Sequence, residues 1–496
     1  MKIKNLIIFI FPLSVFSQPS IAWFEDFNGS GEESIGHYVL SCEDNGFLQI
    51  GETYDYSNSS SEILVIKIDS NGQMIWNREI SIGNHNLGNS AIELNDGYLI
   101  CGGLNQNSAL IKLEKETGST LFIETFNNGG TDAFEHATIT PNGIVAVGYI
   151  NSEDPYNTFY TEGQGYIMFL DNNANEIFSQ NLSEYIDQAY RIKYINNELI
   201  ISGLSEEASD YKVIKMSLDG DIIWHQIYGG DSEDHCFAMD VNANGDIFLA
   251  GHTVSGTVNW DTYTIKINND GDLIWEQIVG NPRGFNPEYI HDEAWGIKST
   301  NDGGCVTIAG TGDEYDNYSE WDGNQCSDIW NAYLIKFDNQ GVIEWERTFS
   351  SLDISNDNYD WAGEAIDLTE DGGAIIAIDN GQFGFLRIDN IQNVLTTDID
   401  LTKPQTFILH NNYPNPFNPS TTLSYELQYR KYIKLVIFDV KGNSIKSLIN
   451  KDQAPGKYSI VWNGKDVQGI SVPSGVYFYS LSVEGHIDKG KMVLLK

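Results

Sequence analysis

Residues 263–275 read YTIKINNDGDLIW, and this stretch contains the unit from which most of the chain is built. Tyr263–Ile267 alternates in the way that a half-buried β-strand does. The turn Asn268–Gly271 follows, and Asn and Gly accept the positive φ that a tight turn needs. Leu273–Ile278 then gives a second strand, which contains Trp275. The stretch therefore predicts a β-hairpin whose second strand carries a tryptophan.

The same hairpin recurs along the chain at intervals of roughly 50 residues, which is typical of a four-stranded propeller blade. Its aromatic residues are Trp23, Trp76, Phe122, Phe178, Trp224, Trp275 and Trp345. A turn of the form Gly-x-x-x-Trp closes at Gly72–Trp76, Gly220–Trp224, Gly271–Trp275 and Gly341–Trp345, with a weaker form at Gly118–Phe122.

The count of strands predicts how the ring closes. Sets of three strands that precede an aromatic strand begin near Tyr38, Ala91, Ala137, Ala189, Phe237 and Trp295. A last set, from Trp361 to Ile388, has no fourth strand, whereas Trp23–Phe27 is a fourth strand with no set before it. We therefore expect an all-β fold, a seven-bladed β-propeller over residues 18–389. The N-terminal strand would close it and remove two exposed sheet edges.

The Gly-x-x-x-Trp turn resembles the tryptophan-docking repeat of quinoprotein-type propellers, with Asp69 and Asp338 three residues before the Gly. It is also similar, more weakly, to the Asp-box hairpin of sialidases, for which Ser217, Asp219 and Trp224 fit. Large aromatic side chains dominate core burial. We expect the Trp of each hairpin to pack between neighbouring blades.

Residues 1–17 are expected to be a secretory signal peptide, because Lys2 and Lys4 precede an apolar run, Leu6–Phe16, that is too short to span a membrane. The chain has a formal net charge of −42, and its acidic excess lies before residue 405. Such a charge argues against nucleic acid or an anionic membrane as a partner. We expect an exported, monomeric protein without a membrane span.

A second domain follows a polar linker at residues 390–405. Residues 406–496 show short strands and turn signals, the pattern of a small Ig-like β-sandwich. Three motifs stand in order, and they contain Pro414, Asn415 and Pro416, then Gly475 and Tyr477, and finally Lys491 and Lys496.

This order of motifs resembles the type IX secretion C-terminal sorting domain, and residues 462–477 resemble the Ig-like part of flagellar hook-capping proteins. The resemblance implies that the domain engages the type IX machinery of a Gram-negative bacterium. It further implies that the protein is secreted or held at the outer-membrane surface. An ordinary C-terminal adhesion sandwich is the alternative.

The cysteines are too few and too scattered for a disulfide scaffold. Cys305 and Cys326 flank the longest loop inside a blade, and export would permit a disulfide between them. Cys42, Cys101 and Cys236 are expected to be small buried hydrophobes.

The sequence contains no catalytic motif that we can identify. A quinoprotein enzyme would need adjacent cysteines and a sialidase a set of arginines that grips a carboxylate, and neither is present. No zinc motif, phosphate loop or nucleophile elbow occurs. We expect no catalytic residue, cofactor or metal. His37, His136, His235 and His291 fall at or near first strands, where they either line the central channel or occupy ordinary strand and loop positions.

Long loops predict a binding face. Second-to-third-strand loops and blade-to-blade loops emerge on the same side of a propeller, and loops on a rigid scaffold commonly carry function. The expected ligand-binding residues on them are Tyr54, Tyr56, Tyr156, Tyr160, Asp313, Glu314, Tyr315 and Trp321. Aromatic rings beside carboxylates suit stacking on sugar rings and hydrogen bonds to hydroxyls. The alternative is that these aromatics pack the loops onto the blades.

The leading hypothesis is a secreted or surface-displayed, non-catalytic β-propeller that binds carbohydrate or protein. The alternative is an exported hydrolase or lyase that acts on polysaccharide.

Overall fold

The computed structural model describes residues 19–152, 163–204, 210–257, 259–280, 291–312, 329–357, 359–391, 407–409, 412, 414–427, 431–438, 444–454, 456–483 and 486–495. β-Strands dominate these residues, and the only helical turn among them is the 3-10 turn η2 (Ser351–Asp353). The chain divides into two compact units. The first contains the described residues up to 391, and the second those from 407 onward. No helix in the described part of the chain is long and apolar enough to cross a membrane.

The first unit contains seven four-stranded antiparallel sheets. The first strands are β2 (Glu33–Ser41), β6 (Asn86–Leu94), β10 (Thr131–Thr140), β14 (Gln188–Ile195), β18 (Asp234–Val241), β22 (His291–Ser299) and β26 (Ala362–Leu368). The second strands are β3 (Phe47–Asp55), β7 (Gly97–Leu104), β11 (Gly143–Ser152), β15 (Glu198–Leu204), β19 (Ile247–Thr253), β23 (Cys305–Gly312) and β27 (Ala374–Asp379). The third strands are β4 (Ser60–Ile68), β8 (Asn107–Leu113), β12 (Gln164–Leu170), β16 (Tyr211–Ser217), β20 (Asp261–Ile267), β24 (Asn331–Phe337) and β28 (Phe383–Asp389). The fourth strands are β5 (Met74–Ile80), β9 (Thr120–Phe126), β13 (Glu176–Asn181), β17 (Ile222–Tyr228), β21 (Leu273–Val279), β25 (Ile343–Phe349) and β1 (Ser20–Phe27).

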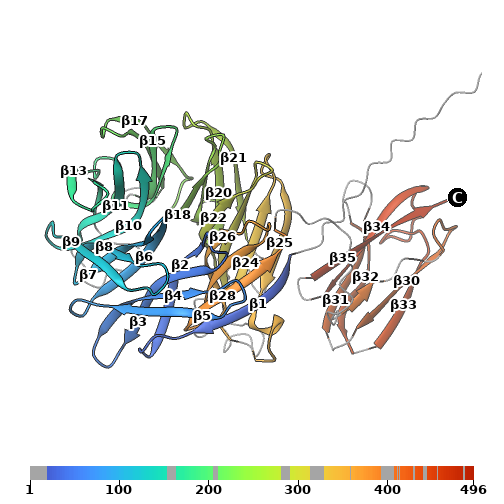
Figure 1. Cartoon of the computed structure of the whole chain (residues 1–496). Helices are drawn as coiled ribbons and strands as arrows, with labels where there is room; N and C mark the ends of the chain where they lie inside the picture. The colour runs from blue at the N-terminus through green and yellow to red at the C-terminus, as the bar shows by residue number, and fades with distance from the viewer. Residues whose placement is uncertain are drawn as a thin grey trace, which may run out of the picture. The chain divides into compact units, whose positions relative to one another are not determined.

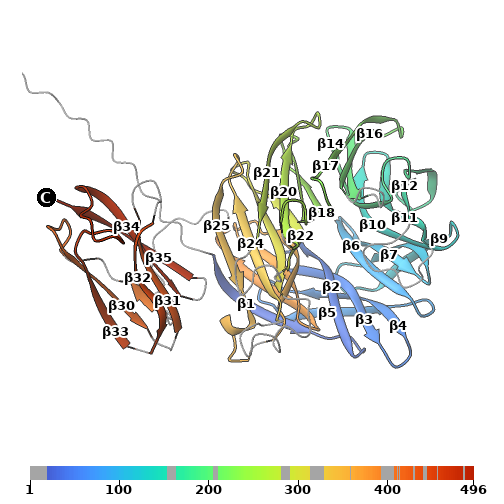
Figure 2. The same cartoon turned by 180° about the vertical axis from the view of Figure 1, so that it is seen from behind.

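The sheets are arranged as in a β-propeller. The first strands gather in the middle of the unit and the fourth strands lie at its periphery (Figures 1 and 2). Each first strand contacts the first strand of the next sheet, and β26 contacts β2. Strand β1 pairs antiparallel with β28, with Phe24 opposite Leu386, so the two ends of this unit share one sheet.

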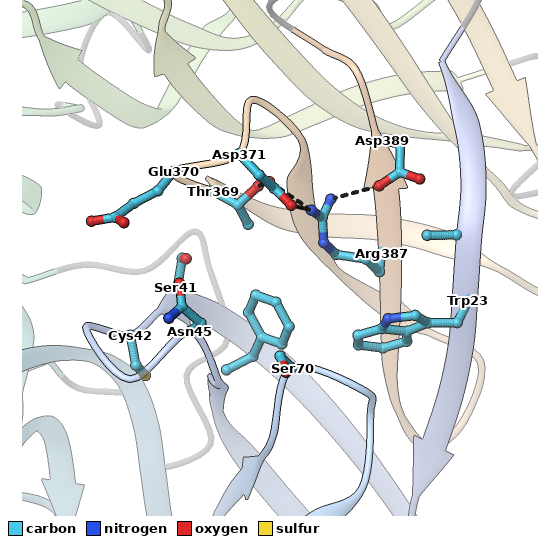
Figure 3. Close-up of a pocket in the computed structure, with 12 residues that line it drawn as sticks. Trp23, Ser41, Cys42, Asn45, Ser70, Thr369, Glu370, Asp371, Arg387 and Asp389 are labelled. Atoms are coloured by element: carbon cyan, nitrogen blue, oxygen red, sulfur yellow. Dashed lines mark hydrogen bonds and ion pairs between the residues drawn. The ribbon is translucent and has the colours of Figure 1, made fainter.

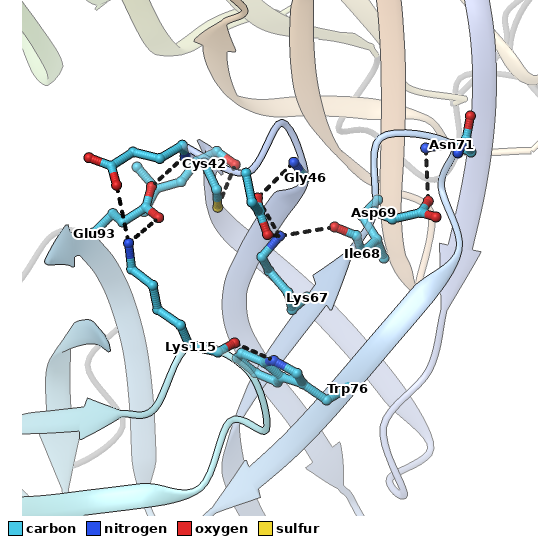
Figure 4. Close-up of polar contacts among 12 residues, drawn as sticks. Cys42, Gly46, Lys67, Ile68, Asp69, Asn71, Trp76, Glu93 and Lys115 are labelled. Atoms are coloured by element: carbon cyan, nitrogen blue, oxygen red, sulfur yellow. Dashed lines mark hydrogen bonds and ion pairs between the residues drawn. The ribbon is translucent and has the colours of Figure 1, made fainter. Parts of the chain in front are cut away.

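The repeated tryptophans pack between neighbouring sheets, as expected. The indole of Trp76 is buried, and its Nε1 donates a hydrogen bond to the carbonyl of Lys115 in the next sheet at 3.0 Å (Figure 4). Trp224 and Trp275 repeat this contact with the carbonyls of Asn269 and Asn339, at 3.3 and 3.2 Å. The Trp thus fills a gap between sheets while its polar atom is satisfied.

A buried cation lies across from most of these aromatic residues. In the register, Lys67 pairs with Trp76, Lys215 with Trp224, Lys266 with Trp275, Lys336 with Trp345, Lys112 with Phe122 and Arg387 with Trp23. Buried charges must be paired. Lys67 accordingly lies 2.9 Å from Asp44, and Lys266 lies 2.9 Å from Asp246. In the sheet of β12 and β13 the place of the cation is taken by Phe169, which stacks on Phe178 at 4.1 Å.

The second unit is a small sandwich of two antiparallel sheets. One sheet contains β29 (Phe407–Leu409), β30 (Thr421–Leu427) and β33 (Gly456–Trp462). The other contains β32 (Ser444–Gln453), β31 (Lys431–Phe438), β34 (Gly475–Val483) and β35 (His486–Leu494). Its core includes Phe417, Tyr425, Trp462, Tyr479 and Met492, all nearly or fully buried.

One expectation needs correction, and two others stay predictions. The segment that carries Tyr54 and Tyr56 was expected to be a long loop, but β3 and β4 remain paired as far as Asp55 opposite Ser60, so most of it is strand. Cys305 is a free, buried cysteine at the start of β23, whereas the loop that carries Cys326 follows the opposite end of that strand. Cys326 lies outside the described residues. The disulfide therefore stays a prediction, and the position of Cys305 does not favour it. The expected signal peptide, residues 1–17, also lies outside them.

Candidate functional site at the inner ring of strands

Each first strand is interrupted by a β-bulge at an equivalent place. The register of β2 against β3 shifts between Gly36 and Tyr38, so that His37 is the extra residue. The same shift occurs in every other sheet of the unit. The extra residues are His37, Asn89, Glu135, Tyr190, Phe237, Trp295 and Glu364. Bulges re-aim side chains and are frequent next to active sites. We call these residues the inner ring.

The residues of the inner ring fall into two groups according to whether their side chains are polar or aromatic. Following the contacts between first strands, Glu364, His37, Asn89 and Glu135 are consecutive and form a polar arc. Tyr190, Phe237 and Trp295 are also consecutive and form an aromatic arc. One side of the ring can therefore hold polar groups and the other side an apolar face.

The aromatic arc is a continuous cluster of packed rings, in which Tyr190 and Phe237 are only 5% and 3% exposed. The ring centroids of Tyr190 and Phe237 are 5.1 Å apart, and those of Phe237 and Trp295 are 4.5 Å apart. These separations lie in the favourable range for aromatic pairs. Trp295 is half-buried, which leaves part of its ring accessible.

His252 lies against this arc from the second strand β19. Its ring is 5.2 Å from that of Phe237 and 5.5 Å from that of Trp295. The side chain is fully buried, and neither imidazole nitrogen has a hydrogen-bond partner among the described residues. Burial holds the pKa of His252 well below its usual range, with a further contribution from His235 and His291.

The polar arc contains a close ion pair. Nε2 of His37 lies 2.5 Å from Oε2 of Glu52, whose side chain is almost fully buried. Burial lowers the pKa of His37, but the charge of Glu52 and its hydrogen bond outweigh burial and raise the pKa to about 9. The other carboxylate oxygen of Glu52 accepts a hydrogen bond from the Gly88 amide of the next sheet at 3.0 Å.

Two further carboxyls of the arc favour their neutral forms. Burial and, to a smaller extent, the negative charge of Asp379 raise the pKa of Glu364 to about 8. Burial also raises the pKa of Glu135 to about 7, although the Arg191 charge opposes that rise. Both pKa values lie near the pH at which a carboxyl can exchange a proton with a ligand.

Directly after the inner ring, three side chains meet across the inside of the first strands. The hydroxyl of Tyr38 lies 3.2 Å from Nε2 of His136, and the guanidinium of Arg191 lies 5.8 Å from the centroid of the Tyr38 ring. These residues come from β2, β10 and β14. Tyr38 therefore bridges first strands that are not neighbours, and the three residues form a floor to the inner ring.

Two residues further along the first strands, ion pairs join neighbouring sheets. Lys193 is 3.0 Å from Asp240, and Lys298 is 2.9 Å from Asp367. Burial would raise the pKa of Asp240, but Lys193 and Lys298 outweigh it and lower the pKa to about 2. Because these charges are paired with one another across sheet boundaries, they hold the first strands together.

Tyr54 and Tyr56 are the expected ligand residues that the structure describes. Their rings stack with centroids 6.0 Å apart, and the hydroxyl of Tyr56, which is 58% exposed, donates to Glu33. Tyr54 follows Glu52 by two residues on β3, on the same face of the strand, and so lies beside the polar arc. The Glu52 charge and burial raise the pKa of Tyr54. The other expected ligand residues, Tyr156, Tyr160, Asp313, Glu314, Tyr315 and Trp321, lie outside the described residues.

Sequence reasoning missed most of the inner ring. His37 and His136 do lie at the ring and its floor. His235 instead packs 4.8 Å from Trp260, and Nδ1 of His291 lies 3.7 Å from Glu293. A bulge depends on the pairing of two strands, so the alternation of one strand alone did not mark these residues.

The second unit brings its three sequence motifs together. Asn415 donates to the carbonyl of Lys491 at 3.0 Å and accepts from the amide of Val493 at 2.9 Å. Phe417 packs on Trp462 at 5.6 Å, and Trp462 packs on Tyr477 at 5.3 Å. Pro414, Pro416 and Gly475 adjoin these contacts in sequence, and Lys496 lies outside the described residues. The motifs thus form one structural cluster.

A separate cavity of about 260 Å³ lies between the sheet of β1 and the sheet of β2 (Figure 3). Its main charged group is the buried guanidinium of Arg387, whose Nη2 donates to both carboxylate oxygens of Asp371 at 2.7 and 2.6 Å. The protein itself neutralises this cation. Among the described residues no cluster of three or more His, Cys, Asp or Glu could hold a metal ion.

Comparison with known proteins identifies part of the second unit. Residues 424–488 match the family model described as the FlgD Ig-like domain, so this unit contains an Ig-like domain of that type. No curated protein is similar to the chain in sequence.

Several solved structures are similar to the chain at low identity. A catalytically inactive virginiamycin B lyase from Staphylococcus aureus with quinupristin is 12% identical, with a TM-score of 0.45, over 74% of this chain and 99% of that one. A fungal alcohol oxidase in complex with copper is 11% identical, with a TM-score of 0.45, over 96% and 100%. The Dos1 propeller is 10% identical, with a TM-score of 0.39, over 76% and 95%. Such low scores say nothing of the activity of this chain.

Proposed function

We propose that the protein is an exported, monomeric, non-catalytic β-propeller of seven blades that binds a carbohydrate or a protein segment at its inner ring. The observation that carries this proposal is the division of the ring into a polar arc and an aromatic arc. Aromatic faces stack on sugar rings, and half-buried polar side chains fix the orientation of a ligand. Tyr54 and Tyr56, beside the polar arc, extend the same surface.

The seven-blade interpretation rests on links between neighbouring first strands. Asp240 accepts a hydrogen bond from the Ser299 amide at 2.9 Å, and Asp367 accepts one from the Ser41 amide at 2.8 Å. The second of these links joins the last sheet to the sheet of β2. Together with the pairing of β1 and β28, these links favour a ring closed by the N-terminal strand over residues 18–389.

An enzyme that acts on polysaccharide is the second candidate. Glu364 and Glu135 have pKa values of about 8 and about 7, and carboxyls in this range serve as general acids and bases. A glycan array with the whole exported protein, followed by chromatography of the unbound glycans, separates the two candidates. Binding without new products supports the first, whereas released oligosaccharides that disappear in Glu364→Gln support the second.

We also propose that the Ig-like domain at residues 406–496 directs export by a type IX system, after removal of residues 1–17 and with residues 390–405 as a linker. The protein would then be secreted or displayed on the outer-membrane surface. The clustering of the three motifs supports this idea, because one partner could contact them together. Deletion of residues 491–496 should trap the protein in the periplasm, and normal export of the truncated chain would refute the assignment.

A further inference from the structure

We infer that the ligand of the inner ring is a cationic saccharide, one that carries free amino groups, rather than a neutral or acidic one. This inference rests on the proposed function and specifies the ligand class of the same site. It follows from the charges around the polar arc and from where the two arcs meet.

Carboxyls outnumber cations at the polar arc. The carboxyls are Glu33, Glu52, Glu135, Glu293, Glu364 and Asp379. The groups beside them that can carry positive charge are His37, Arg191 and His291, which lies 3.7 Å from Glu293. His37 is already paired with Glu52 at 2.5 Å. No salt bridge within the described part of the chain joins Glu364, Glu135 or Asp379 to a Lys or Arg.

Arg191 forms no ion pair with these carboxyls in the described part of the chain, although its charge opposes the rise in the pKa of Glu135. Its Nη1 donates to the carbonyl of Tyr190 at 2.9 Å, and its guanidinium lies over the ring of Tyr38. The ring therefore holds more carboxyls than bases, and burial keeps Glu364 and Glu135 largely neutral, because ionising them without a compensating cation is costly. An anionic ligand would add to that cost, and a cationic ligand would relieve it.

The raised pKa of Glu364 reflects the same excess of carboxyls over cations. Burial and the neighbouring Asp379 and Glu293 charges raise the pKa of Glu364 to about 8. A cation beside Glu364 would favour its carboxylate form and lower that pKa. The site therefore gains favourable charge–charge energy from a cation that it lacks when empty.

The aromatic arc favours a sugar over a flexible cation. Its three rings pack on one another, and Trp295 is the one that is half-buried rather than buried. The arc meets the polar arc at both ends, because Trp295 and Glu364 lie on neighbouring first strands, as do Tyr190 and Glu135. A sugar ring on Trp295 would bring a substituent toward Glu364. A protonated amino group there gains both from the carboxyl and from the aromatic face.

His252 gives an independent sign of a polar ligand. The two unpartnered nitrogens on this fully buried imidazole are destabilising unless a hydrogen bond reaches them. The imidazole packs directly on Phe237 and Trp295. Hydroxyl groups of a sugar, or water held by it, would supply such partners at the aromatic arc.

The test compares ligands that differ only in charge. Short oligomers of glucosamine and of N-acetylglucosamine share their backbone, but N-acetylation removes the positive charge. Calorimetric titration of the whole exported protein is run at about pH 6 and low salt, where primary amines are protonated. We expect the glucosamine oligomer to bind about tenfold more tightly or better, with an advantage that shrinks as salt is added.

Variants locate the effect. Glu364→Gln should lose about tenfold in affinity for the glucosamine oligomer and leave the N-acetylated oligomer unchanged, whereas Trp295→Ala should weaken both. Glu124→Gln, at an exposed carboxyl on the outer strand β9, is the matched control and should change neither. Circular dichroism of each variant confirms that it folds.

Each outcome decides between claims. Equal or tighter binding of the N-acetylated oligomer overturns the cationic ligand but leaves the proposed function standing. Binding of neither oligomer, nor of any other saccharide on the array, overturns the proposed function and this inference with it. A lysine-rich peptide that competes as well as the glucosamine oligomer would overturn the saccharide class.

Discussion

The indole of Trp76 occupies the space that a side chain at Gly118 would need. A Cβ at position 118 would lie 2.5 Å from Cε3 of Trp76, and Gly118 also has a φ of +65°. The two residues belong to neighbouring sheets, and Trp23 with Gly72 and Trp275 with Gly341 repeat the relationship. The Gly and the Trp of one Gly-x-x-x-Trp turn therefore make separate contacts. At Gly72–Trp76, Gly72 meets Trp23 of one neighbouring sheet, and Trp76 meets Gly118 of the other. Trp23, Trp76, Trp224 and Trp275 each cover the Gly of the next sheet.

This relationship predicts that Gly118→Ala destabilises the first unit by more than its backbone conformation alone accounts for. A left-handed backbone costs a non-glycine residue about 1–2 kcal/mol. Overpacking against Trp76 should add about 1–3 kcal/mol. The measurement is the urea midpoint of the transition of the first unit in the whole chain.

Gly256 provides the matched control for this substitution. Its φ is +75°, and a Cβ there would meet nothing within 4 Å. Gly256→Ala should therefore show only the backbone cost. Equal losses from the two substitutions would show that Trp76 does not restrict position 118.

The His37–Glu52 pair should make stability depend on alkaline pH. The pKa of His37 is raised from 6.5 to about 9 in the folded protein, so its contribution is fully present below about pH 6.5 and is lost as pH rises through about 9. Glu52, Glu364 and Asp379 are the charged groups that face it. The contribution is on the order of 2–3 kcal/mol.

Urea denaturation of the parent and of His37→Gln between about pH 6 and pH 10 measures this effect. The parent should lose more stability than the variant over that interval. If the stability of the parent and of the variant falls equally with pH, His37 is not charged in the folded state, and the His37–Glu52 ion pair is refuted.

His252 should act in the opposite direction, at acid pH. Its pKa lies well below 6.5 in the folded state, so its contribution is present above about pH 6.5 and is lost as pH falls below that value. The loss can reach about 1.4 kcal/mol per pH unit. His235 and His291 are the titratable groups that act on it.

His252→Leu should therefore flatten the loss of stability between about pH 6.5 and pH 5, measured by thermal denaturation. The remaining slope would come from His136 and His235, whose pKa values burial also lowers. His225→Leu, at an exposed position on β17, is the control and should leave the slope unchanged. A parent-like slope in His252→Leu would show that His252 has an alternative partner at acid pH.

Much of the fold could be predicted from the sequence, because the hairpin turns and tryptophans that indicate it are local patterns that recur in each sheet. Hairpin turns and the Trp positions predicted the third and fourth strands, and the described strands fall where these patterns placed them. The first strands were predicted to begin near residues such as Tyr38 and Ala91, but they begin at Glu33 and Asn86. The bulges at His37 and Asn89 break the alternation, so the pattern became visible only beyond them.

The inner ring could not be predicted for the same reason. A bulge is a relation between two strands, and sequence alternation in one strand does not reveal which residue lacks an opposite partner. Glu364 and Phe237 also look like ordinary strand residues when read alone. Tyr54 and Tyr56 could be proposed from the sequence because a turn beside aromatic residues is a local signal. The pairing of Glu52 with His37, by contrast, depends on the register of β2 and β3.

Asn415 should hold the last strand of the Ig-like domain. Its side chain makes two hydrogen bonds to β35, each worth about 0.5–1.5 kcal/mol. Asn415→Ala should therefore accelerate hydrogen exchange of the Val493 amide by roughly tenfold. Asn418→Ala is the matched control, because Asn418 is also exposed and also precedes a proline. Equal exchange in the two variants would contradict a role for Asn415 in fixing β35.

Trp23 provides a direct test of ring closure. Its ring lies 5.8 Å from that of Phe47 and covers Gly72, so it joins the sheet that contains β1 to the sheet of β2. If β1 is the fourth strand of the last blade, Trp23→Ala should destabilise the first unit about as strongly as Trp76→Ala. Both should lose about 3 kcal/mol or more in urea denaturation, because each leaves a gap between two sheets. A loss below about 0.5 kcal/mol for Trp23→Ala, the range of an ordinary surface substitution, together with a large loss for Trp76→Ala, would mean that the N-terminal strand is not part of the closed ring.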